Sequence, residues 1–404
     1  MTNDEIIKTT FRVWGESLYQ STSLSDVASA LGVTKPALYR HFKNKDLLLG
    51  AMYSSFYDRF AEFIRADYEF CLKCNDEIEK ELRIARVIAE YLARNREDFL
   101  FGVILVHGNQ ETGFNFLKQL QKRGVDMLKV FPQSSESAIH PPDFQLVLTT
   151  VYFMLAAFHK NRAKNNVTSL GDEILSVFVD QVEERICTGL ALPAEKINAL
   201  DYESLEKAVV FSPCTCTGNE TNKIIEAVIG ALAEAGPWKF SMEMVAKRSG
   251  LSKSSLYSHF ESKEEMLKEA LYGEIGRVTS YAEHCSLLSK QPEEQLYLTL
   301  IGIVAYLRKK SEVLLIFDRF RTRRPVFKTD KCGKGKFTAQ IHRTFSQIKN
   351  ADGTLMISER NTEWILFLIV NLLQRRQAGM SYADIPNESF RMLFRFIARG
   401  LKNM

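Results

Sequence analysis

The chain has 404 residues, more than one hydrophobic core usually organises, so we expect two or more domains. Hydrophobic residues make up 46% and charged residues 25%, a balance that excludes a disordered or fibrous chain. The formal net charge of +4 leaves 53 basic residues nearly balanced by 49 acidic ones, so any nucleic-acid-binding surface must be local.

The N-terminal residues lack the charged and then apolar pattern of a signal peptide. The longest strongly apolar run, Trp364 to Leu373, covers only about half of a membrane span. We therefore expect a cytoplasmic protein without a membrane partner.

Seven cysteines are too few for a disulfide scaffold, and their odd number fits reduced thiols. Cys71 with Cys74 and Cys214 with Cys216 have spacings that can hold a metal, but no histidine is near either pair. We expect no metal and no cofactor.

A twelve-residue stretch nearly recurs in the chain. LYRHFKNKDLLL, residues 38–49, returns as LYSHFESKEEML, residues 256–267. The same alignment pairs Ala28 with Ala246 and Gly32 with Gly250 without a gap, a constant offset of 218 residues (246 − 28 and 250 − 32). This period is far longer than that of a solenoid, so it indicates two tandem copies of a whole domain.

Each copy opens with four helices in close succession. In copy 1 an apolar face over residues 7–18 predicts the first helix, and a capping box from Ser23 starts a second that ends at Gly32. Thr34 is placed to cap the third helix, and Asn44 the fourth. Copy 2 repeats the pattern, with caps expected at Ser252 and Ser262, the latter in a capping box with Glu265.

Longer amphipathic or apolar helices follow, with few strand signals, so the predicted fold is all-α. In copy 1 they cover Glu81 to Ala93, Phe144 to Lys160 and Ile174 to Leu190; in copy 2 they cover Glu294 to Lys309, Ser358 to Gln377 and Glu388 to Leu401. The expected domains are heads at 1–50 and 222–268, helical bodies at 51–191 and 269–404, and a linker at 192–221.

The second and third helices of each copy have the pattern of a helix-turn-helix, whose second helix enters the major groove of DNA. In copy 1 the apolar positions join the two helices and leave Thr34, Lys35, Ala37, Tyr39 and Arg40 to face DNA. In copy 2 the basic character is weaker, because Glu261 offsets Lys253 and Lys263, although Lys247 and Arg248 can compensate.

The run from Val27 to Leu47 resembles the N-terminal domain of the TetR family of bacterial transcriptional regulators, and Val245 to Leu267 resembles it again. The turn glycine, Leu-Tyr, His-Phe and the following lysine all stand at the family's spacing. The close resemblance covers about fifty residues of each copy. It implies two tandem TetR-like units, each a DNA-binding head with a helical ligand-binding and dimerisation body.

The resemblance also implies site residues by position. In copy 1 it places Thr34, Lys35, Pro36, Ala37 and Tyr39 near bases, and Tyr39, His41 and Lys45 near phosphates. The corresponding residues of copy 2 are Ser252, Lys253, Ser254, Ser255, Tyr257, His259 and Lys263.

The fusion departs from the family's usual single copies, which pair as two chains. We therefore predict a ligand-responsive repressor whose two bodies pair within one chain, with double-stranded DNA and an unidentified small-molecule effector as partners. Since the two heads differ in sequence, the operator should have unequal half-sites. Two alternatives stay open: dimerisation of the fused chain, and a TetR-like scaffold that binds a protein partner or the nucleoid without regulating a promoter.

Candidates for an effector site are weaker. Tyr152 and His159 share one face of an apolar helix, and His107 lies in another apolar stretch, although packed core residues are the commoner explanation. The basic run at 319–324 is better explained as a solvated loop than as a nucleic-acid site. No phosphate loop, nucleophile elbow or metal-spaced pair is present, so we expect no enzyme.

Overall fold

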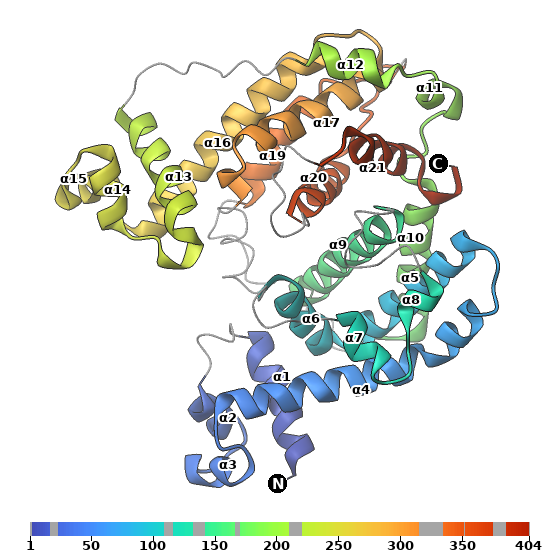
Figure 1. The fold of residues 1–404 in the computed structure, drawn as a ribbon, viewed down its shortest axis with the longest axis vertical. Helices are drawn as coiled ribbons and strands as arrows, with labels where there is room; N and C mark the ends of the chain where they lie inside the picture. The colour runs from blue at the N-terminus through green and yellow to red at the C-terminus, as the bar shows by residue number, and fades with distance from the viewer. Residues whose placement is uncertain are drawn as a thin grey trace. The chain divides into compact units, whose positions relative to one another are not determined.

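The computed structural model describes residues 2–16, 23–108, 116–131, 142–165, 170–209, 220–314, 334–350, 352–374 and 385–403. Across these ranges the regular structure is helical, with one isolated bridge between Lys349 and Leu355 (Figure 1). The predicted all-α class is confirmed. Contacts divide the chain into two compact units, and the division falls after Cys187.

The first unit contains copy 1. Helices α1 to α3 and the start of α4 form the first head, α4 runs unbroken across residue 50, and the later helices form the first body. The elements are α1 (Asn3–Glu16), α2 (Leu24–Ala30), α3 (Lys35–His41), α4 (Lys45–Cys71), α5 (Glu77–Arg94), α6 (Arg96–Gly108), α7 (Phe116–Gln121), α8 (Met127–Val130), α9 (Pro142–Lys164) and α10 (Asp172–Thr188).

The second unit contains copy 2, with α13 to α15 and the start of α16 as the second head. The elements are α11 (Ala194–Asn198), α12 (Tyr202–Ala208), α13 (Glu220–Lys239), α14 (Met242–Ser249), α15 (Lys253–His259), α16 (Lys263–Ser286), α17 (Pro292–Lys309), α19 (Lys334–Phe345), α20 (Glu359–Gln374), α21 (Asn387–Arg399) and the 3-10 helix η3 (Leu401–Asn403). Each long helix predicted from periodicity corresponds to one of the observed helices.

The two heads bury equivalent side chains. Val27 and Leu38 join α2 to α3, and their counterparts Val245 and Leu256 join α14 to α15; all four are fully or almost fully buried. Burying side chains of this size contributes about 2 kcal/mol each. The helix pairs are therefore held by the apolar stripes that the sequence pattern indicates.

An ionic cluster around the buried Asp98 joins three helices in the first body. Arg59 of α4 lies 2.6 Å from the carboxylate of Asp98, in the first turn of α6, and the Tyr91 hydroxyl of α5 donates to the same carboxylate at 2.5 Å. The Arg59 guanidinium also lies 5.2 Å from the ring centroid of Phe11 in α1. One arginine thus contacts a helix of the head and a helix of the body.

The second body has the same arginine and tyrosine but a different carboxylate. Arg277 stands 218 residues after Arg59, and it pairs with Glu274 one turn earlier on α16. The Tyr306 hydroxyl of α17 donates to Glu274 at 2.7 Å. Here the acid comes from the long helix itself, so this cluster joins two helices.

Residues 188–209, which include much of the expected linker, belong to the second unit. Backbone N–H groups of Leu190 and Leu192 donate to the carbonyls of Ile397 and Ala398 at 2.8 and 2.9 Å. Gly189 is required there, because an added Cβ would lie 2.5 Å from the Ile397 carbonyl oxygen. The domain boundaries themselves stay predictions, but this segment, here called the strap, is folded.

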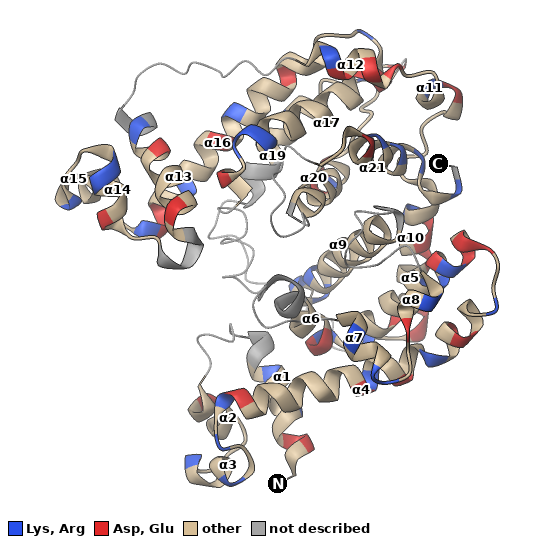
Figure 2. Ribbon diagram, viewed as in Figure 1, with Lys and Arg blue, Asp and Glu red and all other residues tan. Residues whose placement is uncertain are grey.

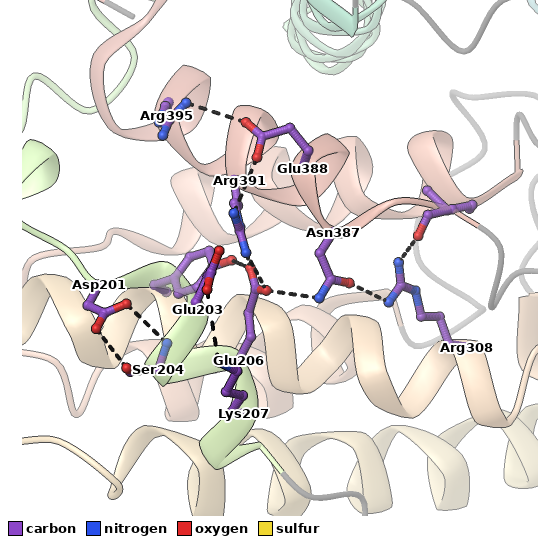
Figure 3. Close-up of polar contacts among 12 residues, drawn as sticks. Asp201, Glu203, Ser204, Glu206, Lys207, Arg308, Asn387, Glu388, Arg391 and Arg395 are labelled. Carbon is purple, nitrogen blue, oxygen red and sulfur yellow. Dashed lines mark hydrogen bonds and ion pairs between the residues drawn. The ribbon is translucent and has the colours of Figure 1, made fainter.

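A buried carboxylate holds the far end of the strap (Figure 3). Glu206 of α12 accepts two hydrogen bonds from Arg391, at 2.8 and 2.9 Å, and one from Asn387 at 2.9 Å. The Tyr297 hydroxyl of α17 donates to it at 2.6 Å. Burial by itself would raise the pKa of Glu206, but these donors outweigh burial and lower it. The strap is thereby fixed to α17 and α21.

Within the described residues no helix is both long enough and apolar enough to cross a membrane.

Candidate nucleic-acid interface

Local capping forms the helix-turn-helix of the first head. The Ser23 hydroxyl accepts from the backbone N–H of Asp26, and the Asp26 carboxylate accepts from the N–H of Ser23, so the predicted capping box is present. After α2, Gly32 adopts φ +67°, and the N–H of Val33 donates to the Ala28 carbonyl at 3.0 Å. This left-handed turn sets the direction in which α3 leaves α2.

Helix α3 buries one side and exposes the other. Leu38 and Phe42 are buried, while Tyr39 is 41% exposed. The remaining candidates of copy 1 are exposed, except that Ala37 and Lys45 are half-buried; the exposed set is Thr34, Lys35, Pro36, Arg40 and His41. The structure thus brings the predicted residues onto one accessible surface at α3.

Three of these positions have particular surroundings. Thr34 is the N-cap of α3 but makes no side-chain capping bond. The imidazole Nδ1 of His41 lies 2.8 Å from the side-chain oxygen of Asn3, which ties the end of α3 to the start of α1. Partial burial lowers the pKa of Lys45 against the attraction of Asp46 and Asp26.

The second head repeats this geometry with different polar groups. Gly250 adopts φ +72° after α14, and the Ser252 hydroxyl caps α15 by accepting from the Ser255 N–H at 3.0 Å. Leu256 is buried and Tyr257 is 48% exposed. Ser252, Lys253, Ser254 and His259 are exposed, while Ser255 and Lys263 are half-buried.

The capping box predicted between Ser262 and Glu265 takes a modified form. Ser262 accepts from the Glu265 N–H at 3.1 Å as expected, but the Glu265 carboxylate accepts from the N–H of Glu261 instead of that of Ser262. Lys263 donates to the carbonyl of Phe240 and lies 4.7 Å from the centroid of its ring. The lysine therefore also holds α16 against the end of α13.

Two basic residues of the second head have acidic partners that were not predicted from the sequence. Glu243 in the first turn of α14 forms an ion pair with Lys253, and Glu234 of α13 lies 2.9 Å from Arg248. Alignment offers a signal for the first pair, because Glu243 occupies the position of Ser25 in copy 1.

The effector candidates differ in their surroundings. The side chain of His107 lies outside the described residues. His159 is fully buried, stacks 5.0 Å from the ring of Phe99, and donates from Nε2 to the Leu92 carbonyl at 2.9 Å. Burial lowers the pKa of His159 to about 4 against that hydrogen bond, so the ring is neutral at pH 7. Tyr152 is half-buried near the same Phe99.

An apolar cavity of about 20 Å³, enough for one water-sized group, lies in the second body between α16, α17, α19 and α20. Its walls are aliphatic side chains: Ile275, Val278, Ile303, Leu307, Val313, Ile341, Leu366, Ile369 and Val370.

In the described ranges no group of three or more His, Cys, Asp or Glu side chains, around Cys71 and Cys74 or elsewhere, is arranged to hold a metal. Cys71 is buried, which raises the pKa of its thiol to about 11, and Cys74 is half-buried. Cys214 and Cys216 lie outside the described residues.

Comparisons with known proteins match both heads. The chain is 23% identical over 152 residues to HTH-type transcriptional regulators from two strains of Mycobacterium tuberculosis, covering 38% of this chain and 73% of each regulator. It is 31% identical over 90 residues to the HTH-type transcriptional repressor ComR of Escherichia coli, covering 22% of this chain and 39% of ComR.

Two solved structures are also similar. They are the fatty acid degradation regulator FadR from Bacillus halodurans (15% identity, TM-score 0.34, 44% of this chain and 96% of that one) and the TetR family transcriptional regulator PfmR from Thermus thermophilus (19% identity, TM-score 0.30, 44% of this chain and 98% of that one).

The profile of the family described as bacterial regulatory proteins, tetR family, matches residues 6–52 and again residues 224–270. These segments are the two heads, at the same offset as the internal repeat. The matched relatives are transcriptional regulators, and DNA-binding regulation is the class of function that the family indicates. The chain therefore carries two copies of a TetR-like N-terminal segment.

Proposed function

We propose that the protein is a sequence-specific, ligand-responsive repressor in which both heads of one chain bind the same operator. The observation that carries this proposal is the exposed tyrosine at the same place in each recognition helix, Tyr39 in α3 and Tyr257 in α15. The buried residues of these two helices are Leu38 and Leu256, so the exposed tyrosines are not what holds the helices to the core. Both copies keep it beside exposed polar residues.

The recognition helices would enter successive major grooves with their N-terminal residues toward base edges. In copy 1 the proposed base contacts are Thr34, Lys35, Pro36, Ala37 and Tyr39, with Arg40, His41 and Lys45 toward phosphates. In copy 2 they are Ser252, Lys253, Ser254, Ser255 and Tyr257, with His259 and Lys263 toward phosphates. Because the two sets differ, the two half-sites should differ in sequence.

The ligand response is proposed to act through the helical bodies. The aliphatic cavity of the second body favours an apolar effector group, because no charged side chain is among its lining residues. Enlarging Val278 to Leu, which adds one methylene group, should fill the cavity and abolish release by such an effector while operator binding persists. Loss of operator binding in this variant would contradict separate sites for ligand and DNA.

Pairing of the bodies within one chain would replace the pairing of two subunits. We expect a cytoplasmic protein with one chain per operator, and light scattering of the complex gives this stoichiometry directly. Two chains per operator would instead support the arrangement with four heads.

The function is tested by selecting bound sequences from a random DNA duplex pool at physiological salt, with Tyr39→Ala and Tyr257→Ala variants in parallel. An asymmetric site, in which each variant blurs a different half, is the expected result. If the wild-type chain enriches no sequence, the regulator proposal fails, and a scaffold for a protein partner or the nucleoid takes its place.

A further inference from the structure

The first lysine of the recognition helix has a carboxylate partner in the second head but none in the described part of the first head. Lys35 and Lys253 occupy equivalent positions at the start of α3 and α15. Lys253 is paired with the carboxylate of Glu243, which comes from the neighbouring helix α14. The equivalent of Glu243 in the first head is the neutral, exposed Ser25. Lys35 has no ion pair in the described part of the chain, and its ammonium group lies 5.9 Å from the centroid of the Tyr39 ring.

The Glu243–Lys253 pair also changes how both groups titrate. The hydrogen bond from Lys253 lowers the pKa of Glu243 to about 2, and the same bond raises the pKa of Lys253. Both side chains remain at least half exposed, so the pair lies on the accessible side of the head. At neutral pH the lysine charge is therefore present but already has a carboxylate beside it.

Other basic side chains of the second head also have partners within the protein. Arg248 pairs with Glu234, and Lys263 is held by the Phe240 carbonyl and ring. The structure describes all of residues 242–263. In this range Lys247 is the exposed cation that has no polar partner. Figure 2 shows acidic and basic residues together on α14.

Three basic side chains at and just after α3 make no ion pair within the described ranges. Arg40 and Lys43 are exposed and, like Lys35, have no ion pair among the described residues; their equivalents in the second head are Ser258 and Glu261. Figure 2 shows only basic charge on α3. At these two equivalent positions the first head therefore has two cations, and the second head has a hydroxyl and a carboxylate.

We propose that Glu243 is an intramolecular counterion that competes with DNA phosphate for Lys253, so that the first head supplies most of the electrostatic contact energy with the operator. This inference rests on the proposed DNA-binding function and adds how the binding energy is divided between the two heads. Because Glu243 already balances the charge of Lys253, the pair brings no net positive charge to displace the cations condensed on DNA, and the carboxylate itself repels phosphate. The second head then binds its half-site mainly through the uncharged groups of Ser252, Ser254 and Tyr257.

The test exchanges the two residues that differ. With the full-length chain and its selected operator, affinity is measured by fluorescence anisotropy at several salt concentrations between 50 and 200 mM. Glu243→Ser should free Lys253, which steepens the slope of log K against log salt by about 0.9 and tightens binding roughly fivefold near 0.15 M salt. Ser25→Glu should place a carboxylate beside Lys35 and change slope and affinity by similar amounts in the opposite direction.

Charge-neutral lysine variants are the control for a general charge effect. Lys35→Gln should weaken binding several-fold, whereas Glu243→Gln combined with Lys253→Gln removes both charges of the pair and should have little effect. Adding Lys253→Gln to Glu243→Ser should abolish the gain of Glu243→Ser. Equal losses in Lys35→Gln and in the variant without the pair would overturn the inference, as would an unchanged affinity and slope in Glu243→Ser. A wild-type chain that selects no sequence overturns the proposed function instead, and the inference with it.

Discussion

The two copies have the same apolar contacts in their heads. They differ in the carboxylate that pairs with the arginine of each body. Leu38 and Leu256 are buried alike, and the tyrosine and arginine of the body clusters are retained. The acid that satisfies the arginine comes from α6 in the first body, as Asp98, and from α16 in the second, as Glu274. Helix geometry is thus maintained by apolar spacing, while a charge requirement can be met from any neighbouring helix with a suitable side chain.

The largest expected effect concerns these two buried acids. Glu274→Gln should destabilise the second unit by about 3 kcal/mol, because it removes the negative charge that Glu274 places beside the mostly buried Arg277. Asp98→Asn should cost about 2 kcal/mol, because water can reach the more exposed Arg59. Native-state hydrogen exchange reports each unit separately. Equal losses in the two variants would show that arginine exposure does not set the cost.

The strap distinguishes the second unit from the first. Glu206→Gln should destabilise the second unit by about 2 kcal/mol, since it replaces a buried charged acceptor of Arg391, Tyr297 and Asn387. Because the folded-state pKa of Glu206 is lowered, its stabilisation is present above the ordinary value near 4.5 and is lost as pH falls below it.

Glu203→Gln on the same helix is the matched control for the strap. Its carboxylate is largely exposed, with Lys207 at 3.9 Å (Figure 3), so its replacement should change stability by less than about 0.5 kcal/mol. Hydrogen exchange of residues 188–209 measures whether the strap is docked. Protection that is the same in Glu206→Gln as in the wild type would contradict docking through Glu206.

The stability of the first unit should depend on pH through the buried His159. The folded-state pKa of His159 is about 4, below its ordinary 6.5, so the unfolded chain takes up a proton first as pH falls. The first unit should therefore lose roughly 2 kcal/mol of stability between pH 7 and pH 4.5, a loss that His159→Gln removes. Denaturant unfolding curves at both pH values measure this, and an equal acid loss in the variant would exclude His159 as its origin.

The smallest effect concerns the recognition-helix caps. Ser252→Ala should cost about 1 kcal/mol, since its hydroxyl accepts from the Ser255 N–H, whereas Thr34→Ala should change stability little, because Thr34 makes no side-chain capping bond. Measured without DNA, the difference isolates capping from base contact. A larger loss for Thr34→Ala would mean that the first head relies on Thr34 in a way that its geometry does not indicate.

The sequence by itself determined the features that depend on near neighbours. Helix periodicity, the Ser23 capping box, the left-handed turns at Gly32 and Gly250, and the repeat all involve residues within a few positions of each other or an offset that alignment exposes. The separation of buried Leu38 from exposed Tyr39 follows from the same spacing. Local backbone geometry decides these features before the chain is packed.

Only the tertiary structure decided which charged groups meet. Glu206 and Arg391 are 185 residues apart, Arg59 and Asp98 are 39 apart, and Glu243 reaches Lys253 across a turn whose angle sets the pairing. Side-chain partners of this kind depend on helix crossing and on which neighbour offers an acceptor, and no single periodicity encodes them. For the same reason the sequence could suggest an effector role for His159 but could not show that its ring is enclosed against Phe99 and the Leu92 carbonyl.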